Sequence, residues 1–317
     1  MCPACRTVEG GRVDVRTLAR DDAGDDRADS ALACACGRRY PIIDHIPIVF
    51  ASPQHGGPDA ASIVERDLPP DVAALIAAPG PDDAPYARLL EHLSVYLDAH
   101  WGERGFASPD LLGKLAALER VPLAVELGCS AGRCLAELAR TADHVVGLDL
   151  QPAMLRRARR ILSNEPLAYA RRMAGRHYEA AALPGAGALA LAPDRYTLVA
   201  GDALDPPLVP GAYDRVAAFN VLDAVRRPGD LLTVMDALCA PGGELILTSP
   251  YSWQTGIVDE DARLGGADPA AAVRALLASG LSAPYHIQDD ADLAWTLRRD
   301  ARSAATYCIH YIRARKG

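Results

Sequence analysis

A glycine-rich turn directly after an apolar run constrains this fold more than any other stretch. Residues 125–133 read VELGCSAGR and continue an apolar run that begins at Leu123. An apolar run that ends in such a turn and is followed by a helix-like segment is typical of a buried strand that leads into a ligand site. Glycine turns of this kind hold dinucleotides, phosphates or sulfonium cofactors, so the flanking residues must distinguish between these ligands.

Strand-like and helix-like segments alternate from this turn to the C-terminus. The strand-like runs cover 123–128, 144–150, 196–203, 213–222 and 242–250, with a closing strand over 306–315. The helix-like runs between them cover 132–141, 152–164 and 230–239. This order predicts an α/β fold, a mostly parallel Rossmann-like sheet with helices on both faces. Such sheets bind their ligands at the carboxyl ends of the strands, where the strand order reverses.

Composition and charge exclude several classes of protein. The chain has 317 residues, enough for one large and one small domain. Its formal net charge of −8 argues against a nucleic-acid partner, which favours basic surfaces. No run of about 18 apolar residues predicts a membrane span. The N-terminus lacks a basic start followed by an apolar stretch, so we expect a cytoplasmic protein that contacts no membrane.

The residues around the glycine turn indicate the cofactor. Nicotinamide enzymes usually carry GxGxxG with an acidic residue about 20 positions later. Here an acid precedes the glycines, in the order Glu126, Gly128, Ser130, Gly132. This spacing resembles the first motif of class I S-adenosylmethionine (SAM) methyltransferases. The resemblance implies that the glycines admit the methionine part of SAM and that Glu126 meets its ammonium group.

Later landmarks follow in the order that this family shows. The resemblance implies that Asp149, in GLDL, accepts hydrogen bonds from the ribose hydroxyls, and that Asp202, in GDA, accepts one from the adenine amino group. Ala203 offers a backbone N–H to the adenine. The residues expected to contact SAM are therefore Glu126, Gly128, Ser130, Gly132, Asp149, Leu150, Asp202, Ala203 and Asn220.

The residues after the fourth and fifth strands bear on the methyl acceptor. Enzymes that methylate exocyclic or amide nitrogens often carry Asn-Pro-Pro-Tyr after the fourth strand, whereas this chain has Asn-Val-Leu-Asp from Asn220 to Asp223. The stretches ELGCSAGR, HVVGLDL, GDALDPP, FNVLDAV and PGGELILTSPYSW, with LGG ten residues later, resemble the C-terminal methyltransferase domain of ovothiol synthase. That domain methylates a ring nitrogen of a mercaptohistidine.

Two departures from that family keep the acceptor open. A cysteine-rich segment stands where the family has its sulfoxide-synthase domain, and Arg263 replaces the tryptophan before LGG. The expected activity is SAM-dependent N-methylation of an imidazole-containing small molecule, such as a thiol-histidine, in natural-product biosynthesis. The alternatives are methylation of a peptide or protein side chain, and a non-catalytic activator that only binds SAM.

An imidazole acceptor suits the residues that follow the fourth and fifth strands. Imidazole is largely neutral at pH 7 and has one nitrogen lone pair, so the site needs to fix the tautomer and ring orientation. The candidate catalytic residues are Asn220, Asp223, Tyr251 and Trp253. Tyr251 or Asp223 could bond the second ring nitrogen, and Trp253 could stack on the ring. Arg298 or Arg302 could pair with a substrate carboxylate.

Four cysteines near the N-terminus predict a metal site. Cys2 and Cys5 form one close pair, Cys34 and Cys36 the other, as in tetrahedral Cys₄ zinc sites. The second pair is Cys-x-Cys, which is tighter than the usual Cys-x₂-Cys, and free thiols or a labile redox site are the alternatives. The pattern CxxC, CxCG and YPIIDHIP resembles the zinc-ribbon-like proteins that activate tRNA and protein methyltransferases. This resemblance implies a structural or partner-docking module.

These features divide the chain into three parts. We predict a zinc-ribbon-like domain over 1–50, a linker and helical cover over 51–112, and the methyltransferase domain over 113–317. Residues 51–85 are rich in Pro, Gly, Asp and Ala, with a short helix expected at 71–77. Residues 86–100 have helical spacing, and a second short helix is expected at 109–120. The longer helix either covers the main domain or forms a lid over the cofactor, with Tyr96, His100 or Trp101 lining the site.

Overall fold

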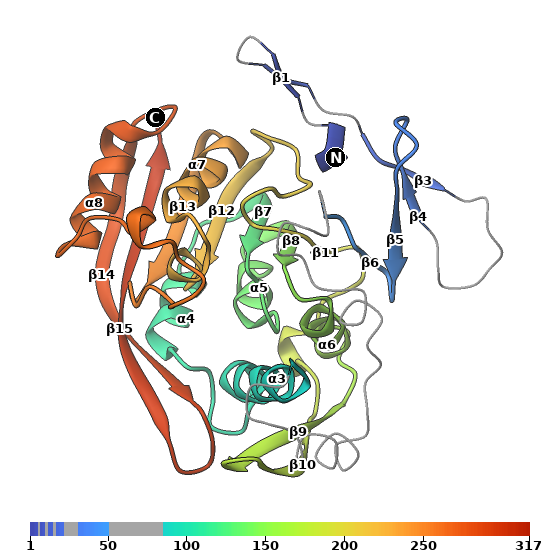
Figure 1. Ribbon diagram of the computed structural model, residues 1–317. Coiled ribbons are helices and arrows are strands. Elements are labelled where there is room, and N and C mark those ends of the chain that lie inside the picture. The colour runs from blue at the N-terminus through green and yellow to red at the C-terminus, as the bar shows by residue number, and fades with distance from the viewer. Residues whose placement is uncertain (6, 10–11, 15–16, 22–30, 51–84) are drawn as a thin grey trace.

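The computed structural model describes residues 1–5, 7–9, 12–14, 17–21, 31–50 and 85–317 (Figure 1). The expected linker, except Pro85, and the short helix at 71–77 lie outside these residues. The described part contains a large mixed sheet with helices, a β-hairpin packed beside it, and a small β-rich N-terminal segment.

The large sheet has seven strands in the order β11-β8-β7-β12-β13-β15-β14. These are β7 (Val121–Leu127), β8 (Ala142–Asp149), β11 (Tyr196–Ala200), β12 (Tyr213–Phe219), β13 (Cys239–Ser249), β14 (Tyr285–Arg298) and β15 (Ala304–Lys316). The strands from β11 to β13 pair in parallel, and β15 pairs antiparallel with both β13 and β14. The strand order reverses at β7, so the residues that follow β7 and β12 meet at the switch point.

The register of the parallel strands aligns the landmarks predicted from the sequence. Leu127 pairs with Leu148, and Asp149 pairs with Ala200, so the glycine turn, Asp149 and Asp202 leave the sheet side by side. Phe219 pairs with Thr248, so Asn220 and the TSPYSW segment leave it together on the other side of the switch point. All of these residues therefore lie along one edge, the carboxyl edge.

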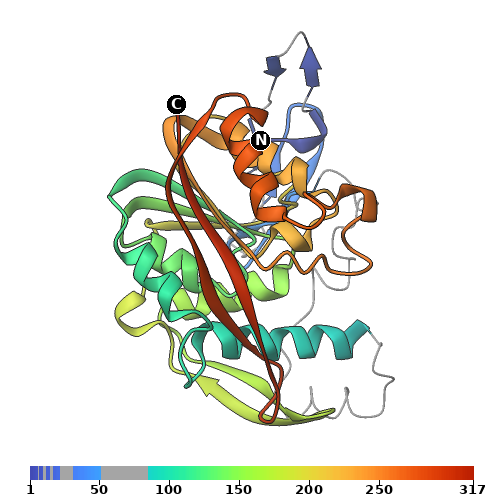
Figure 2. The ribbon, with the colours of Figure 1, turned by 90° about the vertical axis from the view of Figure 1, so that its left-hand side faces the viewer.

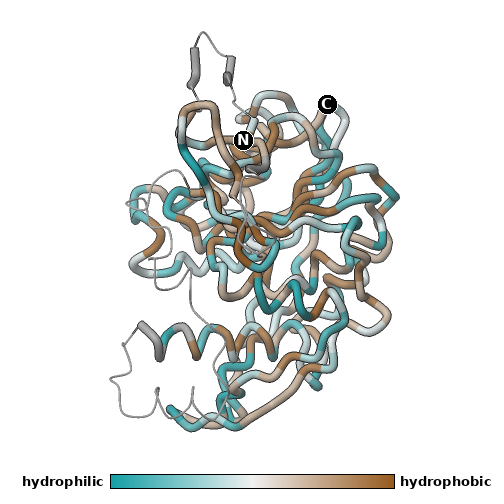
Figure 3. Tube along the Cα trace, turned by 90° about the vertical axis from the view of Figure 1, so that its right-hand side faces the viewer, coloured by the Kyte–Doolittle hydropathy of each residue, from teal (hydrophilic) through white to brown (hydrophobic). Residues whose placement is uncertain are grey.

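Helices cover both faces of the sheet. The helices of the main domain are α4 (Pro109–Ala116), α5 (Arg133–Leu138), α6 (Pro152–Leu162), α7 (Pro228–Leu238) and α8 (Pro269–Ala275), which continues as a π-helix over Leu276–Gly280. One apolar core joins α4, α5 and α6 to the sheet, and a second joins α7 and α8 to the opposite face. The central strands are accordingly the most hydrophobic part of the chain (Figure 3). This confirms the predicted two-faced α/β arrangement.

A long helix and two hairpins extend the fold at the carboxyl edge. Helix α3 (Pro85–Trp101) packs on the hairpin of β9 (Leu167–Ala174) and β10 (His177–Leu183). Figures 1 and 2 show α3 running across the lower end of the sheet, beside the tip of the long β14–β15 hairpin. The β9–β10 hairpin, β14 and α8 had no counterpart among the elements expected from the sequence. The predicted helix over 86–100 is confirmed.

The N-terminal segment docks on the free edge of the large sheet. Its short strands are β1 (Thr7–Glu9), β2 (Arg12–Asp14), β3 (Ala19–Asp21), β4 (Ala31–Ala33), β5 (Arg39–Ile43) and β6 (Ile46–Pro47). Directly after β6, Ile48 forms a parallel bridge with Ala200, and the Val49 N–H donates to the Ala200 carbonyl at 2.9 Å. Asp44 forms an ion pair with Arg156 of α6 at 2.5 Å. The docked residues contact the main core, since Ile46 and Ile48 are buried in it.

Candidate functional site

The glycine turn adopts a backbone conformation that side chains disfavour. Gly128 and Gly132 have φ values of +75° and +79°, in the left-handed region that glycine tolerates. A Cβ atom on Gly128 would lie 2.4 Å from Cγ2 of Val221. Gly132 also begins α5, whose first N–H groups therefore face the turn. The turn thus presents close-packed backbone to whatever occupies the edge.

Glu126 is the second-last residue of β7, just before the glycine turn. Its side chain is almost fully buried, with an exposed fraction of 2%. Burial, and secondly the charge of Asp149, raises the pKa of Glu126 well above its usual 4.5. Among the described residues its Oε2 has no hydrogen-bond partner. A buried carboxylate without a partner is costly, so this atom is suited to receive a cation such as the ammonium of SAM.

Two further buried polar atoms near the turn lack partners. These are Oγ of Ser130 and Oε1 of Gln151, again among the described residues. At the opposite edge, by contrast, the fully buried Arg215 donates to Glu244 at 2.6 Å, to the Glu119 carbonyl at 2.7 Å and to Thr141. The unpartnered groups of the carboxyl edge therefore fit a polar ligand there.

Asp149 connects the turn to the second strand. Its Oδ2 accepts the Ser130 N–H at 2.8 Å, and its Oδ1 accepts the Gln151 N–H at 2.9 Å. Burial raises its pKa, and these backbone bonds oppose that shift. Each carboxylate oxygen keeps a free lone pair for a hydroxyl group. Leu150, directly after it, is 40% exposed, which leaves an apolar face available beside the carboxylate.

Asp202 lies two residues beyond β11, next to Asp149 across the sheet edge. Its Oδ1 accepts the Leu204 N–H at 2.8 Å, which closes a tight turn. Ala203 within this turn is buried. The N-terminal segment supports the same turn, because a Cβ on Gly201 would lie 3.3 Å from the Val49 carbonyl oxygen.

Asn220 holds the end of the fourth strand to the fifth. It has a φ of +56°, and its N–H donates to the Thr248 carbonyl at 2.9 Å. Its side-chain oxygen accepts the Thr248 hydroxyl at 2.9 Å. The structure thus gives Asn220 a role in positioning the edge.

Asp223 is a buried carboxyl three residues further on, with an exposed fraction of 2%. It accepts the Ser249 hydroxyl at 3.3 Å and the Ser252 hydroxyl at 2.6 Å. Burial raises its pKa, and the two serine hydroxyls oppose that rise. Ser249 also accepts the Tyr251 N–H at 3.0 Å, so Asp223 and the TSPYSW segment form one bonded unit.

Tyr251 turns back onto the closing strand. Its hydroxyl bonds Nδ1 of His310 at 2.6 Å, and Nε2 of His310 lies 3.2 Å from Asp290. Arg274 in turn binds both oxygens of Asp290, at 2.7 and 2.9 Å. Trp253 lies beside Tyr251 with ring centroids 5.7 Å apart. Sequence reasoning missed His310, Asp290 and Arg274, because only strand pairing brings β14, β15 and α8 to this edge.

Helix α3 closes the carboxyl edge from below. The Trp101 indole N–H donates to the Ala131 carbonyl in the glycine turn at 2.7 Å, and the Arg133 guanidinium lies over the Trp101 ring. Burial, and secondly the charge of Asp223, raises the pKa of Tyr96. Its neighbour His92, whose ring centroid lies 4.4 Å from that of Tyr96, has its pKa lowered to about 4 by burial. These contacts fix the end of α3 on the glycine turn, and its role as a lid stays a prediction.

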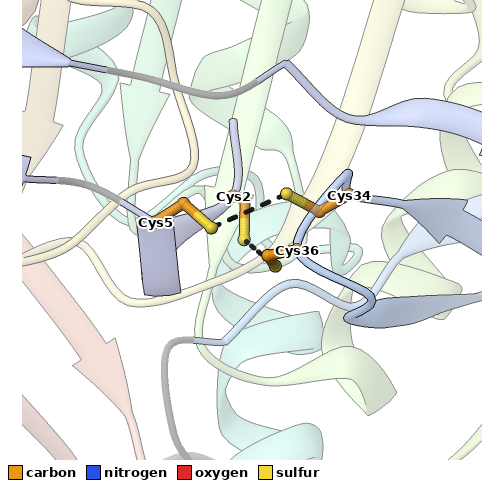
Figure 4. Close-up of side chains that lie close together, drawn as sticks. All are labelled: Cys2, Cys5, Cys34 and Cys36. Carbon is orange, nitrogen blue, oxygen red and sulfur yellow. Dashed lines mark hydrogen bonds between the residues drawn. The ribbon is translucent and has the colours of Figure 1, made fainter.

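The four N-terminal cysteines come together as predicted (Figure 4). Their sulfur atoms all lie within 4.8 Å of one another, with Cys2 4.0 Å from Cys36 and Cys5 3.7 Å from Cys34. Zinc bound by four thiolates at about 2.3 Å needs sulfurs about 3.8 Å apart, so the spacing fits this ion. The Tyr40 hydroxyl lies 3.2 Å from the Cys2 sulfur and adds an outer contact.

A comparison with known families identifies the centre of the chain. Residues 125–245 match the family described as a methyltransferase domain. This stretch contains the glycine turn, Asp149, Asp202, Asn220 and Asp223. This match supports a SAM-dependent methyltransferase domain at the centre of the chain. The cofactor implied by this fold is SAM, in agreement with the prediction from the sequence.

Similar solved structures share a low identity with this chain. The first comes from work on the conversion of a disulfide bond into a thioacetal group during echinomycin biosynthesis, with 16% identity, a TM-score of 0.46, and coverage of 72% of this chain and 92% of the other. A proposed methyltransferase from Bacillus halodurans has 12% identity and a TM-score of 0.44. The match covers 65% of this chain and 97% of the other. A Haloferax volcanii complex between a methyltransferase activator and a proposed methyltransferase has 17% identity and a TM-score of 0.45. The match covers 77% of this chain and 97% of the other.

One further comparison and one search of the structure found no match. No curated protein matches the chain. In the part that the structure describes, no helix combines the length and apolarity needed to cross a membrane.

Proposed function

We propose that the methyltransferase domain transfers the methyl group of SAM to a ring nitrogen of a histidine-like small molecule in natural-product biosynthesis. The observation that carries this proposal is the buried Asp223 carboxyl, which follows the fourth strand and is bonded to the segment that carries Tyr251 and Trp253. The resemblance of TSPYSW and LGG to an imidazole N-methyltransferase supports the same acceptor.

Asp223 suits an acceptor ring that has one N–H group and one lone pair. A carboxylate that accepts the N–H fixes the tautomer, so the other nitrogen presents its lone pair to the methyl carbon. Tyr251 was the alternative partner for this N–H, and its hydroxyl bonds His310, whereas each Asp223 oxygen accepts one serine hydroxyl, has a second lone pair and can carry the negative charge that favours an N–H donor. We therefore assign the tautomer-fixing role to Asp223, and ring stacking to Trp253.

The transfer itself is an in-line displacement. The nitrogen lone pair forms the new N–CH₃ bond while the C–S bond breaks and its electron pair remains on sulfur, which gives S-adenosylhomocysteine. The methylated ring becomes a cation that the Asp223 carboxylate stabilises, and the proton of the other ring nitrogen then leaves to solvent. The chain's residues thus contribute orientation and exclusion of water, with α3 covering the edge.

The cysteine cluster supports a separate proposal, that the N-terminal segment holds a structural zinc ion. Four thiolates fill a tetrahedral shell and leave no open position for catalysis. A backbone N–H of Arg38 is the main group that lowers the pKa of the Cys36 thiol, to about 6, which favours its thiolate form.

The acceptor is tested by product formation with a panel of small molecules. SAM is incubated with thiol-histidines, free histidine and histidine-containing peptides, and S-adenosylhomocysteine is quantified. We expect turnover with a free imidazole amino acid and a loss of about 100-fold in Asp223→Asn, which keeps the shape but removes the charge. Turnover confined to the peptides, and lost without residues 1–50 although SAM still binds, would instead support a peptide or protein acceptor that the cysteine segment docks.

A further inference from the structure

A polar cavity lies away from the glycine turn, between α3, β9 and the tip of the β14–β15 hairpin. Its volume is about 60 Å³, and five arginines and three acidic residues line it. We call it the arginine cavity. Its arginines outnumber its acids although the whole chain has a formal net charge of −8. Figure 2 shows the hairpin tip reaching down beside α3 and the β9–β10 hairpin.

Two of the five arginines are neutralised by acids outside or at the rim of the cavity. Arg171 pairs with Glu179 at 2.5 Å and with Glu103 at 3.7 Å. Arg172 pairs with Glu91 and donates to the Gly175 carbonyl at 2.6 Å. These glutamates therefore already bind Arg171 and Arg172.

The other two lining acids are engaged by neutral donors. Oδ1 of Asp300 accepts the backbone N–H groups of Arg302 and Ser303, both at 2.8 Å, within the hairpin tip. Oδ1 of Asp98 accepts the Tyr169 hydroxyl at 3.3 Å. Neither carboxylate lies within ion-pair distance of a lining arginine.

Three guanidinium groups therefore remain without an acceptor. Arg104, Arg298 and Arg299 form no ion pair or side-chain hydrogen bond with any residue that the structure describes, yet all three line the same cavity. They come from the loop after α3 and from the hairpin tip. Arg104 and Arg299 are exposed and Arg298 is half-buried. Guanidinium groups that line one cavity from separate elements suit a planar or tetrahedral oxyanion, which can accept two hydrogen bonds from each fork.

We propose that the arginine cavity binds a small oxyanion, a phosphate or the phosphate group of a metabolite, through Arg104, Arg298 and Arg299. The size of the cavity fits this ligand. A water molecule needs about 10–15 Å³ of such volume, so 60 Å³ holds about four to six atoms, as a phosphate group requires. The same charge disfavours metal ions and other cations.

The proposed site also contacts the lid helix. Ser94, Val95 and Asp98 of α3 line the arginine cavity, whereas Trp101 of the same helix bonds the glycine turn. A bound anion would therefore join the hairpin tip and β9 to the back of the helix that covers the cofactor edge.

Isothermal titration calorimetry with inorganic phosphate tests the site, with sodium chloride of equal ionic strength as the screening control. We expect one binding site per chain, and at least a tenfold higher Kd in Arg299→Gln, since one charge-assisted hydrogen bond contributes a factor of about ten or more. Arg298→Gln should behave alike. The matched control is Arg302→Gln, in the same hairpin tip but outside the lining, and its Kd should stay within about twofold of the wild type.

The outcomes distinguish a phosphorylated metabolite from free phosphate as the ligand. They also separate the arginine cavity from the proposed SAM site. Tighter binding of O-phosphoserine than of phosphate would assign the cavity to a phosphorylated metabolite, and the reverse order to free phosphate. Absence of binding for both anions, or equal Kd values in the wild type and Arg299→Gln, would overturn the proposal. SAM binding measured on the same variants should not change, so failure here is separable from failure of the proposed methyl transfer.

Discussion

Glu126 is a single residue at the carboxyl edge whose burial opposes folding and which we propose binds the cofactor. Its carboxyl is buried, close to the carboxylate of Asp149, and its Oε2 lacks a partner among the described residues. Its pKa is therefore higher in the folded chain than in the unfolded chain. An acid whose pKa rises on folding contributes stability only at low pH, and this stability is lost as the pH rises from about 4.5 through the raised value.

The variant Glu126→Gln should separate these two effects. Without the ionisable group, the SAM-free protein should have a higher melting temperature than the wild type at pH 7, and the difference should vanish below pH 4.5. SAM binding should weaken by about tenfold or more, because the ammonium group loses a charged partner. Thermal melts across pH and calorimetry with SAM measure the two effects. A variant that binds SAM as the wild type does would refute the assignment of Glu126.

Asp149 supports both the turn and the proposed ribose contacts. Replacing it with alanine removes an acceptor for two backbone N–H groups and for the cofactor, so SAM affinity should fall by about 10–100-fold. Asp143→Ala is the matched control, since Asp143 lies on the same strand but forms an exposed pair with Arg120. Surface pairs of this kind contribute about 0–1 kcal/mol, and SAM affinity should be retained. Equal losses in the two variants would contradict the role given to Asp149.

At the scale of elements, α3 links the cofactor turn to the rest of the site. One indole hydrogen bond, from Trp101 to the Ala131 carbonyl, ties the end of the helix to the turn. Aromatic contacts continue from His92 through Tyr96 to His100 along the same face of the helix. The helix is therefore fixed on the cofactor turn through Trp101.

Trp101→Phe tests this link while keeping an aromatic side chain. A six-membered ring remains, but the N–H and the five-membered part of the indole are lost, and the lost hydrogen bond, about 0.5–1.5 kcal/mol, should weaken SAM binding by about 2–10-fold. Fluorescence or calorimetric titration with SAM measures it. Trp253→Phe serves as the control, since we place Trp253 on the acceptor side, and its SAM affinity should be unchanged. If both variants bind SAM as the wild type does, α3 does not act as a lid.

At the scale of the whole molecule, the cysteine cluster and the end of β11, where we propose that adenine binds, are physically joined. The cluster organises the segment that continues into Ile48 and Val49, which bond to the end of β11. Asp202 follows β11 by two residues. The metal ion that we propose would therefore act on cofactor binding from a distance, through a docked edge segment.

Metal removal should accordingly weaken SAM binding as well as stability. We expect one zinc ion per chain by elemental analysis, and its loss in Cys34→Ser. The metal-free protein should melt at a lower temperature and bind SAM several-fold more weakly, because the Gly201 turn loses its support from Val49. Cys308→Ser, an exposed cysteine outside the cluster, is the control. A full zinc content in Cys34→Ser would exclude the four-thiolate site.

The sequence by itself determined the central strands and their helices, and it predicted the cofactor residues between them. These depend on local signals: apolar runs, helical periodicity, and glycines at positions of positive φ, each within a few residues. Cysteine spacing likewise indicated a four-sulfur cluster, which the fold assembles. The β9 strand was missed because its alanine- and arginine-rich sequence has high helix propensity, which hairpin pairing overrides.

Only the tertiary structure decided which distant groups meet at the site. His310 reaches Tyr251 because β15 runs antiparallel beside β13, and Ser249 pairs with His310 in that register. The face of α3 that covers the turn, and the arginines that converge behind it, depend in the same way on packing between segments far apart in sequence. A single sequence carries no local signal for such contacts, because their geometry arises only when the sheet, the hairpin and the helix pack together.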